Sequence, residues 1–232
     1  MTSPDYVLDV AAFVVFASVV VGYELATRIP ALYRHSIHAA VQRHRHGWFQ
    51  VMAGRESRIV DAQLLGWLSN GNAFFASTSA IAIGGLAALL GAGERARELV
   101  GSLPYAAATS PLLWEVKVLL LMAIIVFAFF KFAWAFRLSH YTVIMVGATP
   151  AHDSQDTAER ARHAAAAANV LGIVGEHANS GLRAFHYAIA GLAWFYHPVA
   201  LMVVTGVVLA VIVRRDHFSR ARAFLREAGP GP

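Results

Sequence analysis

The chain has 232 residues, of which 57% are hydrophobic and only 14% are charged. A soluble domain carries about 25% charged residues, so the composition excludes an ordinary soluble protein and predicts an all-α polytopic membrane helix bundle. Of the 19 basic residues 17 are arginines, and most of them follow apolar runs, which indicates contact with anionic lipid headgroups rather than nucleic acid. Cysteine is absent, which excludes disulfides, thiolate nucleophiles and cysteine-ligated clusters.

The first transmembrane span is expected over residues 6–26, with no cleavable signal before it. Residues 28–60 mix apolar residues with arginines, so we expect them to lie along the inner membrane surface as amphipathic helix. The second and third spans are predicted at residues 64–90 and 112–136. Residues 156–170 are rich in alanine and predict a further cytoplasmic helix.

The end of the chain allows two interpretations, because residues 181–215 could form one long kinked helix or parts of two spans. The arginines of residues 27–62 predict a cytoplasmic loop, and the five arginines of the tail should face the same side. Only the two-span interpretation satisfies this rule, and Pro198 offers the break between helices. We therefore predict a single integral membrane domain over residues 1–232, with spans four and five at 171–196 and 198–213. Its N-terminus lies outside and its C-terminus in the cytoplasm.

Polar residues are predicted to gather in the cytoplasmic halves of spans two, three and four. Lys131 stands there among aromatic residues, and an isolated cation at such depth costs about 3 kcal/mol on insertion scales. It must therefore find a partner, snorkel to the surface or lose its proton. The polar residues at a similar depth are Asp61, Asn70, Asn72 and Glu176.

Span four carries a polar stripe, since spacings of four and three place Asn179, Arg183 and His186 on one helix face. Either the stripe only packs against span three, or Arg183 binds an anion while His186 carries protons. The candidates for a substrate or ion pocket are therefore Lys131, Arg183, His186, Asp61, Glu176, Asn70, Asn72 and Asn179. No catalytic residue is predicted.

Cofactor sites are less well supported by the sequence. His35, His38, His44 and His46 stand among arginines without an interleaved carboxylate, so headgroup contact explains them better than a metal site. His186 is the deepest candidate for a haem ligand, but no second histidine faces it at mid-membrane depth. Haem b therefore remains a minor alternative, and no metal is predicted.

Four segments carry a resemblance to a known family: GRESRIVDAQLLGWL, FFASTSAIAIGGLAALLGA, FFKFAWAFRLSHY and NSGLRAFHYAIAGLAWFYHP. Together they resemble an uncharacterised bacterial family, catalogued as a domain of unknown function, over roughly residues 10–225. The resemblance implies a small multi-pass protein of the bacterial inner membrane. It implies no activity, cofactor or catalytic residue.

Three classes of function follow from these observations. The first is a transport- or channel-like protein with a cytoplasm-facing polar pocket for an anionic or proton-coupled small solute. The alternatives are a non-catalytic accessory or assembly subunit of a larger membrane complex, and a redox protein that binds haem b or quinone. An enzyme is less expected, because the sequence contains no HExxH or GxSxG pattern. The expected partners are the lipid bilayer and either further copies of the chain or a larger complex, without nucleic acid.

Overall fold

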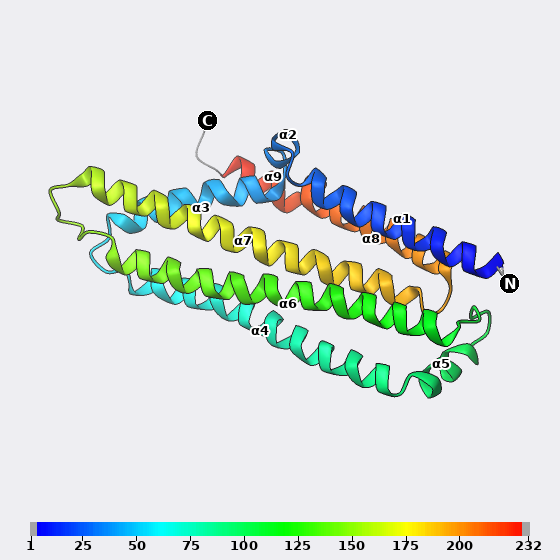
Figure 1. Ribbon diagram of the computed structural model, residues 1–232. Coiled ribbons are helices and arrows are strands. Elements are labelled where there is room, and N and C mark those ends of the chain that lie inside the picture. The colour runs from blue at the N-terminus through cyan, green and yellow to red at the C-terminus, as the bar shows by residue number, and fades with distance from the viewer. Residues whose placement is uncertain (1–3, 229–232) are drawn as a thin grey trace.

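The computed structural model describes residues 4–228, and all regular structure in this range is α-helical (Figure 1). The prediction of an all-α helix bundle is therefore confirmed. In chain order the helices are α1 (Pro4–Ala26), α2 (Pro30–Tyr33), α3 (Ile37–Ala53), α4 (Ile59–Gly91), α5 (Gly93–Gly101), α6 (Pro111–Ala148), α7 (Thr157–Ala193), α8 (Pro198–Phe218) and α9 (Arg220–Glu227).

Four segments are long and apolar enough to cross a membrane, which makes the chain a membrane protein. They are Tyr6–Ala26, Ile59–Gly91, Pro111–Ala148 and Pro198–Glu227. Each contains one of the predicted spans. The remaining predicted span, 171–196, falls largely on α7, which is not among the four.

Helix α7 is largely covered by other helices, although Ile173, Ile189 and Leu192 on it are exposed. It packs against α6 along most of its length, against α3 in its first half and against α8 in its second half (Figure 1). Within it, Arg183 meets a partner on α1 and Asn179 meets one on α3. A helix enclosed in this way can cross a membrane without being apolar, since polar residues in membrane proteins face the bundle interior.

The second half of the chain also differs from prediction in its helix boundaries. Residues 156–170 do not form a separate helix, because α7 continues unbroken from Thr157 to Ala193, with Asp156 accepting the Glu159 N–H at 2.7 Å as its N-cap. The break at Pro198 is present: α7 ends before it, and α8 begins with this proline at its first turn. Residues 181–213 thus belong to two helices and not to one kinked helix.

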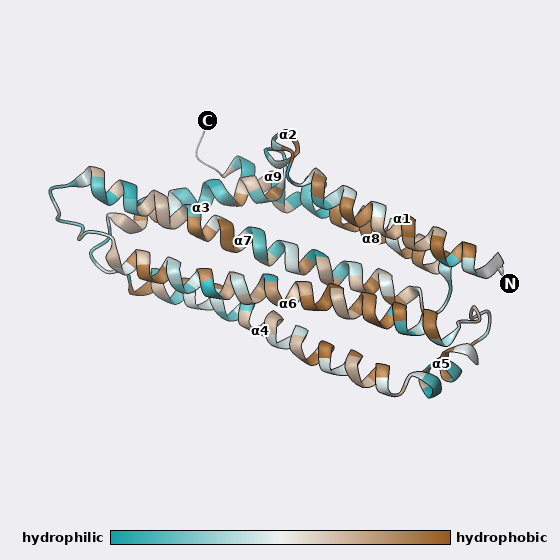
Figure 2. Cartoon of the chain, viewed as in Figure 1, coloured by the Kyte–Doolittle hydropathy of each residue, from teal (hydrophilic) through white to brown (hydrophobic). Residues whose placement is uncertain are grey.

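Because the helices differ in length, the shorter ones form two tiers along the long helices: α1 and α8 form one tier, and α3 forms the other. At 1.5 Å per residue, α4, α6 and α7 are about 50–57 Å long, well beyond the roughly 30 Å of a bilayer core. The shorter α1 and α8 cover one half of this length and α3 covers the other (Figure 1). Hydrophobic residues concentrate along α1 and α8, whereas α3, α9 and the start of α7 are more hydrophilic (Figure 2). Residues 28–60 were predicted to lie along the membrane surface, but α3 instead runs alongside α7.

Glycines of α7 allow the neighbouring helices to approach closely. A Cβ atom added at Gly181 would lie 2.7 Å from the Phe132 ring of α6, and one added at Gly191 would lie 2.6 Å from Leu121. Such distances are shorter than real Cβ contacts, so the buried neighbour would have to shift to make room for a side chain at either position. At Gly84 and Gly85 of α4, by contrast, an added Cβ would have no neighbour within 4 Å.

We expect Gly181→Ala to destabilise the protein by about 1–3 kcal/mol, the usual cost of an added methyl group in a packed core. Gly206→Ala on α8 is the matched control, because an added Cβ there has no neighbour within 4 Å. The control should be neutral or slightly stabilising, since alanine is favoured over glycine in a helix by about 0.5–1 kcal/mol. Thermal unfolding followed by circular dichroism in detergent compares the two variants. Equal midpoints would contradict the close approach of α6 and α7.

Candidate functional site

Two carboxylates of helix α1, Asp9 and Glu24, each pair with a cation from another helix. At 1.5 Å per residue they are about 22 Å apart along the helix axis. Asp9 lies near the N-terminal end of α1, and Glu24 lies near its C-terminal end, where α3 begins. The two pairs therefore mark opposite ends of the tier formed by α1 and α8.

The pair at the Asp9 end is almost completely buried. The Lys117 Nζ of α6 lies 3.3 Å from Asp9 Oδ1, with Lys117 1% and Asp9 3% exposed. Lys117 also donates to the Trp194 backbone carbonyl at 3.0 Å, and the Trp194 indole N–H donates to Asp9 Oδ1 at 2.6 Å. This three-residue contact joins α1, α6 and the end of α7.

The pair at the other end is bidentate. Arg183 of α7 donates through Nε to Glu24 Oε1 at 2.7 Å and through Nη2 to Oε2 at 2.9 Å. The Tyr187 hydroxyl donates to the same Oε1 at 3.3 Å. The Arg183 side chain is 8% exposed and the Glu24 side chain 28%, so the carboxylate is partly open to its surroundings. Two parallel charge-assisted hydrogen bonds fix the guanidinium in one orientation.

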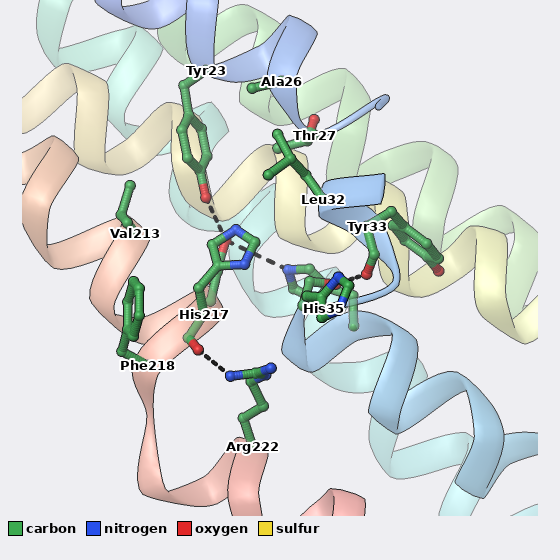
Figure 3. A pocket seen from close by; sticks show the side chains of 13 residues that line it. Tyr23, Ala26, Thr27, Leu32, Tyr33, His35, Val213, His217, Phe218 and Arg222 are labelled. Carbon is green, nitrogen blue, oxygen red and sulfur yellow. Dashed lines mark hydrogen bonds and ion pairs between the residues drawn. The ribbon is translucent and has the colours of Figure 1, made fainter. Parts of the chain in front are cut away.

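A second carboxylate, Asp216 of α8, lies close to the Glu24 pair and is 1% exposed. It accepts a hydrogen bond from the Tyr23 hydroxyl at 2.9 Å, drawn as the dashed line that starts at the Tyr23 oxygen in Figure 3. The His38 Nε2 of α3 lies 3.6 Å from the same carboxylate, and Arg215 Nε lies 3.3 Å from its other oxygen.

His38 connects this carboxylate to α7. Its Nδ1 lies 2.9 Å from the Asn179 amide nitrogen. Because an amide nitrogen can only donate, Nδ1 accepts this hydrogen bond, and the proton of a neutral His38 must reside on Nε2, facing Asp216. The side chains of Tyr23, Asp216, His38 and Asn179 therefore form a polar chain across α1, α8, α3 and α7, in which the step of 3.6 Å from His38 to Asp216 is an electrostatic contact without a hydrogen bond.

Three cavities adjoin His38, with volumes of about 450, 390 and 320 Å³. The 390 Å³ cavity is also lined by Arg28, Glu176, Asn179 and Arg183, and the 320 Å³ cavity by Arg45, Asn179, Arg215 and Asp216. We use the term junction cluster for the six side chains that meet here: Tyr23, Glu24, His38, Asn179, Arg183 and Asp216. The cluster is the candidate functional site, because it combines buried charges, an imidazole and open space.

Helix α3 contributes further charge beside the cluster. The Arg45 guanidinium fills the space that a side chain at Gly175 would need, since an added Cβ would lie 2.5 Å from its Nη2. Burial lowers the pKa of Arg45, while the charges of Tyr33 and Glu176 oppose that change. Burial also raises the pKa of the Tyr33 hydroxyl, and the Glu176 carboxylate raises it further. Glu176 and Tyr33 both line the 390 Å³ cavity, which thus has acidic and basic groups on its wall.

The four histidines predicted to contact headgroups have separate partners. His35 bonds the Ala31 carbonyl, His44 the Leu225 carbonyl and His46 the Gln42 amide, and only His38 belongs to the junction cluster. Within residues 4–228 no group of three or more His, Cys, Asp or Glu side chains is arranged to hold a metal ion.

The sequence of the chain matches one known protein family. The sequence model of a protein family of unknown function, DUF599, matches residues 11–221. The chain belongs to this family. The resemblance to an uncharacterised membrane family is therefore confirmed. No curated protein and no solved structure matches the chain. The family description assigns no activity, so function has to be inferred from the site itself.

The structure brings three of the eight predicted pocket residues together in this family member. Asn179 and Arg183 belong to the junction cluster, and Glu176 lines the same 390 Å³ cavity. His186 is half-buried and donates from Nδ1 to the Leu182 carbonyl of its own helix at 2.7 Å, provided that tautomer carries the proton.

The other predicted residues lie elsewhere. Asp61 is buried where α3 meets α4, and it accepts hydrogen bonds from Trp48 at 2.7 Å and from Arg55 at 2.5 Å. Of the two amides on α4, Asn72 is buried and Asn70 is exposed.

Lys131 is half-buried, and its Nζ lies 5.1 Å from the centre of the Phe127 ring. No carboxylate of residues 6–228 lies within ion-pair distance of it. An aromatic face of its own helix therefore takes the place of the polar partners considered from the sequence.

Sequence reasoning missed Glu24, Asp216, Tyr23 and Lys117 as parts of buried networks. Glu24 and Asp216 each stand at the end of an apolar run beside arginines, a position that is usually solvated. One signal was available: Lys117 is one of only two lysines, and it precedes an uninterrupted apolar run in a predicted span. A lysine in that place requires a buried partner, and Asp9 is an acid within another span.

We expect Arg183→Leu to lower the free energy of unfolding by about 3 kcal/mol, because it leaves the Glu24 carboxylate unpaired. The double variant Glu24→Leu/Arg183→Leu should lose less than this single variant, since it removes both charges together. Unfolding by SDS in mixed micelles measures both values. The single variant Glu24→Leu completes the comparison. If the losses in unfolding free energy of the two single variants add up to that of the double variant, the two side chains do not interact.

Proposed function

We propose that this protein is a small transport- or channel-like membrane protein that takes up an anionic solute at the junction cluster and couples it to protons. The observation that carries the proposal is the meeting of a buried guanidinium, two carboxylates and an imidazole beside cavities at one end of the apolar tier. Burying charged groups costs free energy unless they are tightly paired. Ionisable residues inside a membrane protein therefore often mark a functional site.

The solute site is the 390 Å³ cavity. Arg183 lines this cavity and donates hydrogen bonds to Glu24 through Nε and Nη2. Its Nη1 donates no hydrogen bond to any other residue in the range 6–228. Arg28 and Asn179 line the same cavity and add a second cation and an amide donor. An incoming carboxylate or phosphate can therefore bind Nη1 first and then compete with Glu24 for the rest of the guanidinium.

His38 supplies the coupling to protons. A proton that binds Nδ1 produces an imidazolium, which strengthens the attraction to Asp216 and removes the acceptor of the Asn179 amide. The Asn179 side chain must then either turn its amide oxygen toward the His38 ring or give up its hydrogen bond to His38. Because Asn179 lines both the 390 and 320 Å³ cavities, protonation changes the wall of the solute site.

The opposite end of the bundle is closed in this conformation. Between α1, α6, α8 and the end of α7, this end holds the buried Asp9–Lys117 pair and the packed side chains of Phe16, Trp194 and Leu201. A cavity of about 240 Å³ lies beside this pair, between α1 and the start of α6. A solute can reach the junction cluster from the arginine-rich end, which the positive-inside rule assigns to the cytoplasm of a bacterial inner membrane. Crossing the membrane requires that the Asp9–Lys117 pair separates.

A second candidate is an accessory subunit of a larger complex, favoured by the surface of α4. This helix packs mainly against α6 and exposes large apolar side chains along its length, including Ile59 (68%), Trp67 (76%) and Ile81 (76%). Since α4 is about 50 Å long, a bilayer core of roughly 30 Å does not cover all of it. A partner protein could cover the remainder.

Flux measurements separate the two candidates. We expect currents on a solid-supported membrane carrying the reconstituted protein when acetate, succinate or inorganic phosphate is added. Arg183→Gln should reduce the current at least tenfold, whereas Lys131→Gln, which removes a cation outside the cluster, should leave it within twofold. His38→Gln should retain anion flux but lose the accompanying acidification reported by a trapped pH dye. No current with any probe, or a current unaffected by Arg183→Gln, would contradict the transport proposal and favour the accessory role.

The closed end can be tested by labelling a single introduced cysteine, because the natural chain contains none. Ala190 is 1% exposed and lies in the packed region between the two ion pairs. We expect Ala190→Cys to react slowly with a membrane-impermeant maleimide, and at least fivefold faster when combined with Asp9→Leu/Lys117→Leu. The added pair of leucines leaves no unpaired buried charge, so folding should be retained. An unchanged rate would show that apolar packing alone closes this end.

A further inference from the structure

A cavity of about 450 Å³ lies between the ends of α1 and α8, beside α2 and α9. Its walls differ in chemistry. Val213 and Phe218 of α8 form one side and Leu32 lies across from them, while Arg222 of α9 stands at the foot of the cavity, close to His217 (Figure 3). One part of the cavity is therefore apolar and another part is basic.

Arg222 has unused hydrogen-bonding capacity at this place. Its Nη1 donates to the His217 backbone carbonyl. Its Nε atom is buried and has no hydrogen-bond partner among residues 4–228. The one acid lining the cavity is Asp216, which is already engaged by Tyr23 and His38. A buried guanidinium donor without a partner favours an anion, since leaving it unpaired costs free energy.

The position of the cavity adds a second argument. It lies where the apolar segments of α1 and α8 end, and in the sequence Arg28, Arg214 and Arg220 stand near these ends. Anionic headgroups occupy this level of a membrane, and basic pockets between transmembrane helices bind them. A soluble anion would satisfy the basic part of the cavity but leave the apolar walls of Leu32, Val213 and Phe218 facing water.

We propose that this cavity binds an anionic phospholipid. The phosphate lies against Arg222 and His217, and the beginning of an acyl chain lies between Leu32 and the Val213–Phe218 wall. The inference goes beyond the transport proposal, because the lipid occupies the α8–α9 side of Asp216 while the solute occupies the Arg183 side. Since Tyr23, His38 and Asp216 also line this cavity, a bound lipid contacts the polar chain of the junction cluster.

The test uses the full-length protein in mixed micelles with phosphatidylglycerol and phosphatidylcholine as probes, and native mass spectrometry to count the lipids retained. We expect at least a fivefold preference for phosphatidylglycerol, reduced at least fivefold in Arg222→Gln. Arg226→Gln is the matched control, because it removes the same charge from the exposed face of α9 and does not line the cavity. Its preference should stay within twofold of the natural protein.

Two results would overturn the proposal. An equal loss in both arginine variants would show that the preference comes from the general charge of the surface. Displacement of phosphatidylglycerol by an equal concentration of glycerol 3-phosphate would show that the cavity binds a free anion and not a lipid.

A second variant keeps the test decisive if Arg222→Gln fails to fold. Val213→Trp fills the apolar part of the cavity and leaves Arg222 in place, so it should lose phosphatidylglycerol at least fivefold. Val211→Trp places the same ring on the exposed side of α8, and it should retain the lipid. Retention of phosphatidylglycerol by Val213→Trp would contradict the acyl-chain position and with it the phospholipid.

Discussion

The buried ion pairs of α1 determine how this helix joins the rest of the bundle. A charged group taken out of water costs several kcal/mol unless another charge or a set of hydrogen bonds compensates it. Asp9 therefore requires Lys117 of α6, and Glu24 requires Arg183 of α7. Because the two carboxylates stand about 22 Å apart on one helix, satisfying both sets the height and the rotation of α1. Apolar packing against α8 alone would allow several registers.

The polarity of α7 follows from the same constraint. Arg183 and Asn179 can remain at depth because Glu24 of α1 and His38 of α3 supply partners, while α6 and α8 pack against other parts of the helix. Lipid would supply none, so the helix has to occupy the interior of the bundle. This central position also brings Asn179 and Arg183 next to the cavities where a solute could enter. Structure and proposed function thus depend on one polar helix enclosed by four neighbours.

The junction of the two helix tiers concentrates the chemistry of the molecule. α1 and α8 end there and α3 begins, so three chain segments place their terminal polar residues against the middle of α7. Imperfect filling between helix ends leaves the cavities around His38. A proton, an anion or a lipid headgroup that binds here alters contacts made by all three segments. The Asp9 end lacks this convergence and is held by a single compact pair.

The sequence by itself determined the class of the protein, the approximate positions of four apolar helices and the break at Pro198. These features depend on local composition and on the backbone restrictions of proline, which act over short distances along the chain. It also identified Asn179 and Arg183 on one face of a helix, since helical spacing is a local property. Only the tertiary structure decided which helix meets each charge. Lys131 and Asp61 stand at a depth that suggested a common pocket, yet they lie on faces with different neighbours. Glu24, His38 and Asp216 come together across nearly two hundred residues of chain because helix packing, and not sequence spacing, places a partner beside each buried charge.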